Sequence, residues 1–326
     1  MDRAYKQLKK ISGLSVSQNE PLKDHTTFQI GGPASLYLEV REPQALPEVL
    51  KILRTEKINY LILGGGSNLL VSDQGFKGAV IKKFPRPLSI SGTAVTVDAS
   101  YSLAGLIMAT LDSRLTGLEF AAGVPGTVGG AIKGNAGTYG EAMDKVVKTV
   151  SYINSDLQPA ILENSGCCFA YRHSIFKEHD NWLITDSVIK LEQGNIEASR
   201  RLIEERIGYR MRTQPYGKPS AGCTFKNIIY TESLAAKLKN LGWELPEKFK
   251  KYKKIPAAWL IENLDLKGRA IGQAKIADEH ANYIINLGGA TADQVVQLIS
   301  LIKMKVRDEL GIQLEEEIRY LGFEPS

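Results

Sequence analysis

The segment AAGVPGTVGGAIKGNAGTYG constrains the fold of this chain more than any other, because it contains seven glycines between Gly123 and Gly140. No single regular helix or strand carries glycine at that density, since glycine loses more conformational freedom on folding than any other residue. The few side chains let a ligand approach the main chain, and Thr127, Asn135 and the backbone donors are suited to line a diphosphate or a flat ring. A glycine-rich loop packed only against itself is the less favoured alternative.

A second glycine cluster, GGGSN at Gly64–Asn68, follows the apolar run YLIL. Consecutive glycines after a strand can form a nest of backbone N–H groups that binds an anion. The cluster is not a dinucleotide fingerprint, because Leu69 stands where the third glycine of G-x-G-x-x-G belongs and the following LLVSD is strand-like. A tight hairpin without chemical importance explains this cluster equally well. The two clusters together favour an extended ligand such as a dinucleotide.

Apolar periodicity predicts an α+β fold around these clusters. Strands are predicted at SLYLEV, NYLIL, AVIKKF, AVTVD, VVKTVSYIN and NWLITDSVIKLEQ. Helices are predicted over 43–58, 101–120, 196–212 and 291–311, and the first lies between two strands as a β–α–β unit. Thr291 and Gln294 form a capping box for the last helix, and Gly311 suits its C-terminal cap.

Composition excludes several classes of protein. A length of 326 residues predicts two or three domains, and 43% apolar with 24% charged residues is ordinary for a soluble globular protein. No segment approaches about 18 uninterrupted apolar residues, and the polar N-terminus lacks a signal peptide, so we expect a cytoplasmic protein without membrane insertion. The three cysteines and four histidines match no disulfide framework or metal-ligand spacing, so no metal is expected.

The net charge of +5 resides in one segment, EKFKKYKKIP, which carries five lysines (Lys248, Lys250, Lys251, Lys253 and Lys254). Without these five lysines the net charge of the chain would be zero. Interleaved with Phe249 and Tyr252, the run is compatible with an RNA-binding patch or with an anionic ligand, but a solvated surface is the commoner explanation.

Motifs along nearly the whole chain, from about Leu22 to Gly322, resemble those of the UDP-N-acetylenolpyruvoylglucosamine reductase family. In chain order they are TTFQIGGPA, ILGGGSNLL, LEFAAGVPGTVGGAIKGNAGTYG, FAYRHSIFK, PSAGCTFKN, AAWLIENLDLKGRAIG, DEHANYIIN and LEEEIRYLG. An ordered series of this kind is far more specific than one glycine loop. The direct run from GTYG to the next strand and on to the YR motif is more similar to the type II branch, which lacks an extra substrate-capping insertion.

The resemblance implies an FAD-binding fold of the vanillyl-alcohol-oxidase type, made of two α+β subdomains, plus a C-terminal α+β substrate-binding domain. We expect FAD-binding subdomain 1 at residues 1–84, joined by 316–326, subdomain 2 at 85–206, and the substrate-binding domain at 207–315. The implied protein is a cytoplasmic flavoenzyme of peptidoglycan synthesis, and hence of cell-wall biogenesis, cell shape and cell division. Its partners would be small molecules and not nucleic acid or a membrane, and we expect a monomer because no sustained heptad is present.

In the family, NADPH reduces tightly bound FAD and leaves, and the enolpyruvyl substrate then enters the same site. Hydride passes from flavin N5 to C3 of this substrate, and a proton reaches C2. Carried over motif by motif, the cofactor-binding residues are Gly64, Gly65, Gly66, Ser67, Asn68, Gly123, Pro125, Gly126, Thr127, Gly129, Gly130 and Asn135.

The resemblance also implies the catalytic residues. Arg172 matches the family arginine that clamps and polarises the substrate carboxylate, with Tyr171 hydrogen-bonding beside it. Glu317 matches the glutamate that stabilises the intermediate, although without the family Glu315 and Glu316 would be equal candidates. Lys226 and Asn227 match substrate-binding positions.

Cys223 stands where the family most often has the serine that donates the proton. From the residues alone, a small buried hydrophobe is the better interpretation of a lone cysteine in YGKPSAGCTFKN. A thiol with a reference pKa of about 8.5 is nevertheless a far stronger acid than an alcohol and is mostly protonated at neutral pH. With the family in view, Cys223 is predicted to protonate C2, whereas Cys167 and Cys168 are predicted to be packing residues.

Residues 228–255 depart from the family, which runs more directly to the next helix and usually has proline at the position of Ile228. The lysines of this insert would attract the diphosphates of NADPH and the UDP-sugar, or they form only a solvated extension. Two other functions stay open at this point: another FAD-dependent oxidoreductase on the same fold, and a nucleotide- or RNA-binding protein that uses the lysine run. The second leaves both glycine clusters unexplained.

Overall fold

The computed structural model describes residues 1–323, and these residues form two units that both mix helices and strands. The first unit comprises Met1–Pro21, Pro33–Gly66 and Gly75–Arg210, and the second comprises Leu22–Gly32, Ser67–Gln74 and the chain from Met211 onward. The expected α+β class is confirmed. The expected limits of the three domains stay a prediction, and residues 324–326 of the expected 316–326 segment lie outside the described part of the chain.

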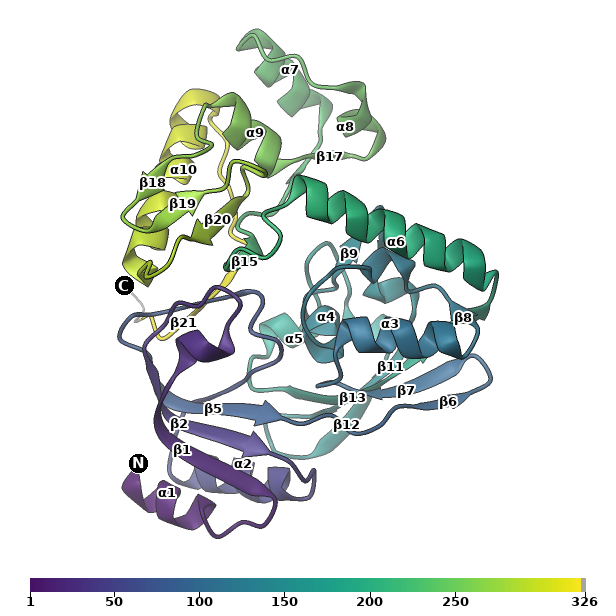
Figure 1. Ribbon diagram of the computed structural model, residues 1–326, viewed down its shortest axis with the longest axis vertical. Helices are drawn as coiled ribbons and strands as arrows, with labels where there is room; N and C mark the ends of the chain where they lie inside the picture. The colour runs from purple at the N-terminus through teal and green to yellow at the C-terminus, as the bar shows by residue number, and fades with distance from the viewer. Residues whose placement is uncertain (324–326) are drawn as a thin grey trace. The chain divides into compact units, whose positions relative to one another are not determined.

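One sheet of the first unit has the strand order β1–β2–β5–β3, with β1 antiparallel to β2 and both β2 and β3 parallel to β5. Its elements are β1 (Leu14–Pro21), β2 (Pro33–Val40), β3 (Tyr60–Ile62), β5 (Phe76–Lys83), α1 (Asp2–Leu8) and α2 (Ala45–Thr55). Both helices lie beside this sheet in Figure 1. The apolar stripe of α2, from Leu46 to Leu53, is at most 3% exposed, as its helical spacing predicts. The predicted β–α–β unit is therefore confirmed.

The other sheet of the first unit is antiparallel, in the order β12–β11–β13–β7–β6. Its strands are β6 (Ser89–Ser91), β7 (Ala94–Asp98), β11 (Val147–Ile153), β12 (Pro159–Glu163) and β13 (Leu183–Lys190). The associated helices are α3 (Leu103–Asp112), α4 (Val128–Lys133), α5 (Ile175–Glu178) and α6 (Ile196–Thr213), the last belonging to this unit up to Arg210. Short pairs join β8 (Leu115–Thr116) to β14 (Glu192–Gln193), and β9 (Gly137–Thr138) to β10 (Glu141–Ala142). Short 3₁₀ turns lie at η2 (Glu119–Ala121), η3 (Met143–Lys145) and η4 (Asn164–Cys167).

Two predictions for this unit need correction. The helix predicted over 101–120 ends at Asp112, because Arg114 and Gly117 have positive φ angles of 60° and 118° that no helix accommodates. The glycine-rich segment is not wholly irregular, since α4 forms within it, with the Thr127 hydroxyl accepting a hydrogen bond from the Gly130 N–H.

The cysteines behave differently from one another. Cys167 is fully buried in the core of this unit, as predicted, and burial raises the pKa of its thiol to about 11, with smaller contributions from Cys168 and Glu163. Cys168 is exposed, so its prediction as a packing residue is wrong. It follows η4 with a φ of 48°, the left-handed conformation that ends this turn. None of the three cysteines, Cys167, Cys168 and Cys223, forms a disulfide bond.

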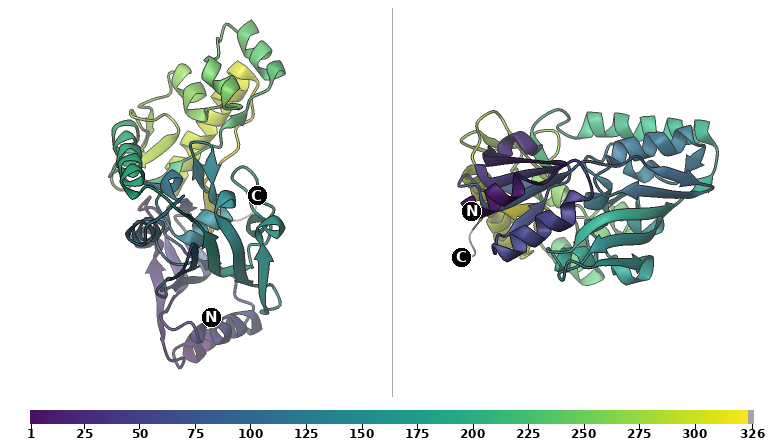
Figure 2. Two further views of the ribbon diagram at one scale, coloured as in Figure 1. Left: turned by 90° about the vertical axis from the view of Figure 1, so that its right-hand side faces the viewer. Right: turned by 90° about the horizontal axis from the view of Figure 1, so that it is seen from below.

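The second unit contains the antiparallel sheet β15–β20–β19–β18 and the parallel pair β21–β4. Its elements are η1 (Leu22–His25), β4 (Leu69–Val71), β15 (Ser220–Cys223), β18 (Ala270–Ile271), β19 (Ala274–Ile276), β20 (Tyr283–Asn286), β21 (Arg319–Leu321), α9 (Ala257–Asn263) and α10 (Ala292–Leu310). Figure 2 shows α10 beside this sheet. The capping box of Thr291 and Gln294 and the left-handed Gly311, with a φ of 59°, are confirmed.

The insert at residues 228–255 is a packed part of the second unit. Its elements are β16 (Ile228–Ile229), α7 (Glu232–Asn240), α8 (Glu247–Lys251) and β17 (Lys254–Ile255). The two strands pair antiparallel and close its base. Leu238 and Phe249 are buried in the same core as α10, and Trp243 packs edge-on against Trp259 of α9 with ring centroids 5.3 Å apart.

Candidate active site

The first glycine cluster lies directly after β3 and is not a hairpin. In a hairpin β3 and β4 would pair, but β3 pairs with β5 and β4 pairs with β21. The Gly64 carbonyl accepts a hydrogen bond of 2.5 Å from Lys82 Nζ, which fixes the start of the turn. Gly66 has a φ of 62°, so the turn needs a residue that tolerates the left-handed region.

The two glycine clusters meet within the first unit. A Cβ added to Gly64 would lie 2.8 Å from Thr127 Oγ1, and one added to Gly65 would lie 2.7 Å from Gly126 Cα. The Gly126 carbonyl accepts from the Leu103 N–H at 3.0 Å, which ties the second cluster to the start of α3. The sequence prediction that both clusters serve one ligand is therefore supported by their direct contact.

The other predicted cofactor residues of this unit surround that contact. A Cβ on Gly129 would lie 2.9 Å from the Ala99 Cβ, so glycine is required where α4 begins beside β7. Gly65, Gly123, Pro125 and Gly130 are exposed. Asn135 is only 4% exposed and lies further along the segment.

Tyr171 and Arg172 form the centre of a tight turn in the same unit. Ala170 and His173 close this turn with two backbone hydrogen bonds of 3.1 Å each. Arg172 has a φ of 55°, its Nη1 donates to the Gly137 carbonyl at 3.0 Å, and its guanidinium carbon lies 5.4 Å from the centroid of the Tyr171 ring. The arginine is thus held against the glycine-rich segment.

The segments that carry Cys223 and Glu317 pair with each other in the second unit, although 317 − 223 = 94 positions separate the two residues in sequence. Phe225 and Glu316 form an antiparallel bridge, and the Glu317 N–H donates to the Thr224 carbonyl at 2.8 Å. Cys223 is partly exposed at the end of β15, after a bulge that contains Gly222 with a φ of 79°.

Ser67 and Asn68 contribute to this second group. A Cβ added to Gly222 would lie 4.0 Å from the Ser67 carbonyl oxygen, so the two backbone segments are neighbours. Asn68 Nδ2 donates to the Glu317 carbonyl at 3.0 Å, and the Asn68 carbonyl accepts from the Arg319 N–H at 2.9 Å. Asn68, at the end of the GGGSN cluster, is therefore bonded to the segment that carries Glu317.

FAD suits the residues of the first unit. Where the two glycine turns meet, Gly65 is exposed and Gly64 and Gly126 are half-buried, and main chain without side chains is suited to a diphosphate or a flat ring system lying along it. Within residues 1–323, no group of three or more histidine, cysteine or acidic side chains is placed to hold a metal ion.

Comparisons with known proteins agree with this geometry. A model of the C-terminal domain of UDP-N-acetylenolpyruvoylglucosamine reductase matches residues 214–321, and a model of an FAD binding domain matches residues 34–156. A UDP-N-acetylenolpyruvoylglucosamine reductase from Caldanaerobacter subterraneus is 39% identical over 93% of this chain and 93% of its own length. The Bacillus subtilis enzyme of the same name is 34% identical over 99% of each chain. This chain belongs to the UDP-N-acetylenolpyruvoylglucosamine reductase family.

A solved member of this family has the same fold. The crystal structure of the Thermus caldophilus reductase is 30% identical and covers 94% of this chain and 98% of its own, with a TM-score of 0.73. The expected FAD-binding fold with a C-terminal α+β domain is confirmed.

In this reductase-family chain, the three acids of the LEEEIRYLG motif have different surroundings. Glu315 pairs with Lys226 at 2.7 Å, and this hydrogen bond lowers the pKa of its carboxyl below the ordinary value. Glu316 pairs with Lys303 of α10 at 2.9 Å. The role of Glu317 stays a prediction. Lys226 and Asn227 are also still predictions for substrate binding, and the Asn227 Oδ1 accepts from the Ala257 N–H at 3.2 Å.

Two residues that organise the site, Lys82 and Asn282, were not predicted from the sequence. Lys82 holds the first glycine turn, and burial lowers its pKa, partly offset by Glu39. Asn282 is 2% exposed and binds both backbone groups of Phe225, at 2.9 Å and 2.8 Å. In the sequence, only the position of Asn282 within the DEHANYIIN motif points to a role in the site. Nothing in the sequence singles out Lys82, which is one residue of a predicted strand.

Proposed function

We propose that this chain reduces UDP-N-acetylenolpyruvoylglucosamine to UDP-N-acetylmuramate in peptidoglycan precursor synthesis, with FAD as bound cofactor and NADPH as reductant. The FAD-dependent reductase activity follows from relatives that match at 33–39% identity over nearly the whole chain. The structural observation that carries the residue roles is the hydrogen bond from the Glu317 N–H to Thr224, which joins two predicted catalytic segments. No helix among residues 1–323 is long and apolar enough to cross a bilayer.

The chemistry left to the protein is proton transfer and charge stabilisation. When bound, FAD would be held by the glycine turns that meet at Gly65 and Gly126 and would supply the transfer of hydride from NADPH to C3 of the enolpyruvyl group. C2 must then gain a proton, and the adjacent carboxylate must be stabilised while negative charge develops on it.

Cys223 is the proposed proton donor to C2. Its thiol loses one proton to carbon and regains one from solvent, so the step balances without a further reactant. The partial exposure of Cys223 supports this assignment, because a fully buried packing residue such as Cys167 could not reach a substrate. The bulge at Gly222 redirects the end of β15 where Cys223 lies.

Arg172 and Glu317 are the proposed stabilising residues. The planar guanidinium of Arg172 can bind the substrate carboxylate through two hydrogen bonds. The backbone of Glu317 is held by Thr224 and Asn68, which supports a fixed carboxyl near Cys223. Glu317 would stabilise the intermediate by hydrogen bonding.

An anaerobic visible spectrum tests the proposal. NADPH should bleach the flavin band of the purified protein, and only UDP-N-acetylenolpyruvoylglucosamine should restore it. NADH in place of NADPH is the control for the reductant. A flavin that bleaches but never recovers with the enolpyruvyl sugar would remove the substrate, and a protein that contains no flavin would remove the function.

A further inference from the structure

Asn135 connects the glycine-rich segment to the turn that carries Arg172. Its side-chain Nδ2 donates to the Ala170 carbonyl at 3.0 Å, and its Oδ1 accepts from the Asp144 N–H at 3.0 Å. With 4% of its surface exposed, Asn135 has its side chain enclosed between these backbone groups. The amide that sequence motifs assign to the cofactor is therefore already used by the protein itself.

The turn needs such support because its geometry is strained. Asn135 and Arg172 both have positive φ angles, 40° and 55°, which are uncommon for residues other than glycine. Strained conformations persist only where the surroundings determine them, and they gather at functional sites. Besides Asn135, the turn is held by Lys177 Nζ, which donates to the Arg172 carbonyl at 2.8 Å, and by the Ser174 hydroxyl, which donates to the Lys133 carbonyl at 2.8 Å.

We infer that Asn135 is a positioning residue, which locks the turn of Tyr171 and Arg172 onto the glycine-rich segment and so directs the Arg172 guanidinium at the substrate carboxylate. The bond from Asn135 to Ala170 and the bond from Arg172 to Gly137 join the same two segments, two residues apart on each. Loss of the first removes one of the bonds that fix the direction of the arginine. The inference rests on the proposed role of Arg172.

Asn135→Asp isolates the relevant bond. Aspartate has the same size, tolerates a positive φ, and keeps an acceptor for the Asp144 N–H, but it cannot donate to Ala170. In the FAD-loaded enzyme, we expect reoxidation of the flavin by UDP-N-acetylenolpyruvoylglucosamine to slow by about 10- to 100-fold, as for small misplacements of a catalytic group. Reduction by NADPH should stay unchanged, because it does not use the substrate carboxylate clamp.

Asn164→Asp is the matched control. Asn164 Nδ2 donates to the carbonyls of Asp144 and Val147, at 2.9 Å and 2.7 Å, so it binds the same Asp144 backbone as Asn135, but both of its acceptors lie outside the turn of residues 170–173. This variant should lose thermal stability comparably and keep both half-reactions. Asn135→Gly, which also accepts the positive φ, is the second variant and should behave like Asn135→Asp.

A double-mutant cycle with Arg172→Ala decides whether Asn135 acts through the arginine. Arg172→Ala alone should slow reoxidation by about 100- to 1,000-fold, and Asn135→Asp should then add less than about a threefold further loss. Normal reoxidation in Arg172→Ala would remove the proposed role of the arginine. Equal losses from Asn135→Asp in both backgrounds, or none in either, would overturn the positioning role while that of Arg172 stands. Loss of flavin from both Asn135 variants but not from Asn164→Asp would also overturn it and assign Asn135 to cofactor binding.

Discussion

The turn of Tyr171 and Arg172 and the strand that ends at Cys223 both carry predicted catalytic residues, but the protein holds them in different ways. The turn is fixed largely by side chains that bind backbone groups, among them Asn135 and Lys177. The chain just after the strand is paired through its backbone with two other segments, because the Thr224 N–H donates to the Asn282 carbonyl at 2.7 Å and the Thr224 carbonyl accepts from the Glu317 N–H. The attachment of the turn therefore depends mainly on single side chains, whereas the strand is held by backbone pairing together with side chains such as that of Asn282.

The largest effect should come from removing the Cys223 thiol, which the strand tolerates structurally. Cys223→Ala should slow flavin reoxidation by the enolpyruvyl sugar by about 100- to 10,000-fold, the usual contribution of a general acid. Reduction by NADPH and thermal stability should stay near those of the parent, because backbone pairing keeps Glu317 in place. Stopped-flow absorbance of the two half-reactions measures this.

Cys223→Ser is the control for the same position, because it restores the hydroxyl that is commoner in the family, and it should retain turnover. If Cys223→Ala reoxidises at the rate of the parent, another group donates the proton and the assignment is wrong.

The first unit, which carries the turn, also contains a buried ion pair. Lys83 Nζ and Asp98 Oδ2 lie 2.6 Å apart, and their side chains are 5% and 1% exposed. Burial alone would raise the pKa of Asp98, but hydrogen bonds from Lys83 and from the Ser100 N–H hold it below the ordinary value. Asp98→Asn leaves the Lys83 ammonium without its counterion and should cost about 3–5 kcal/mol of unfolding free energy.

The sign of the pH dependence follows from the lowered pKa. Asp98 stabilises the folded state above its unfolded pKa of about 3.9, and this stability is lost as pH falls through the lower folded value. Thermal unfolding of the parent should therefore depend more steeply on acid pH than that of Asp98→Asn. Asp156→Asn, in an exposed pair with Arg54, is the control and should cost at most about 1 kcal/mol. If Asp98→Asn costs as little unfolding free energy as Asp156→Asn, the prediction is contradicted.

Local parts of the fold were predictable from sequence, and the site was predictable only through the family. The stripe of α2 and the caps of α10 depend on residues within a few positions, so periodicity and capping rules located them. The contact between Gly65 and Gly126 and the bond from Asn68 to the Glu317 carbonyl depend on partners far along the chain. No local pattern encodes these partners. The side-chain bonds of Asn135 and Asn282 could not be predicted for the same reason.

A smaller effect should distinguish the asparagines that support the two regions. Asn282→Asp cannot donate to the Phe225 carbonyl, which leaves a buried acceptor without that bond and should cost about 1–3 kcal/mol of unfolding free energy. Both half-reactions should survive, because β20 and Glu317 still pair with the strand. Denaturant unfolding and stopped-flow absorbance together measure this.

The control for Asn282 is Asn263→Asp, which removes an exposed bond of 2.7 Å to the Trp259 carbonyl in the same unit and should change stability little. The comparison between turn and strand would break if Asn282→Asp slowed reoxidation as much as Asn135→Asp.

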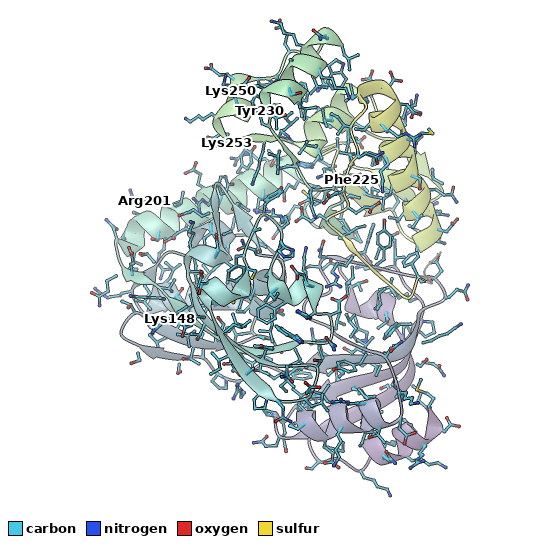
Figure 3. The ribbon with its side chains drawn as sticks, turned by 180° about the vertical axis from the view of Figure 1, so that it is seen from behind. Lys148, Arg201, Phe225, Tyr230, Lys250 and Lys253 are labelled. Atoms are coloured by element: carbon cyan, nitrogen blue, oxygen red, sulfur yellow. The ribbon has the colours of Figure 1, made fainter. Side chains whose placement is uncertain are left out.

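The smallest expected effect concerns the insert, which begins next to Asn227 in the unit of Cys223. Figure 3 shows Tyr230, Lys250 and Lys253 on this insert. Lys250 pairs with Glu232 at 2.8 Å, whereas Lys248, Lys251 and Lys253 are exposed on or just after α8. Replacing these three by glutamine should raise the KM for the UDP-sugar about threefold at low ionic strength. The reason is that positive charge near the site increases the rate at which an anionic ligand encounters the enzyme.

Added salt tests this origin, because screening shortens the range of the field to about 8 Å at physiological ionic strength. The difference in KM between parent and the triple lysine variant should disappear as salt is raised. A control that replaces Lys6, Lys9 and Lys10 by glutamine makes the same change of charge at exposed positions of the other unit, and it should leave the KM unchanged. Equal salt dependence in parent and insert variant would show that the lysines form only a solvated surface, and the insert would then serve the second unit through the packing of Leu238 and Phe249 alone.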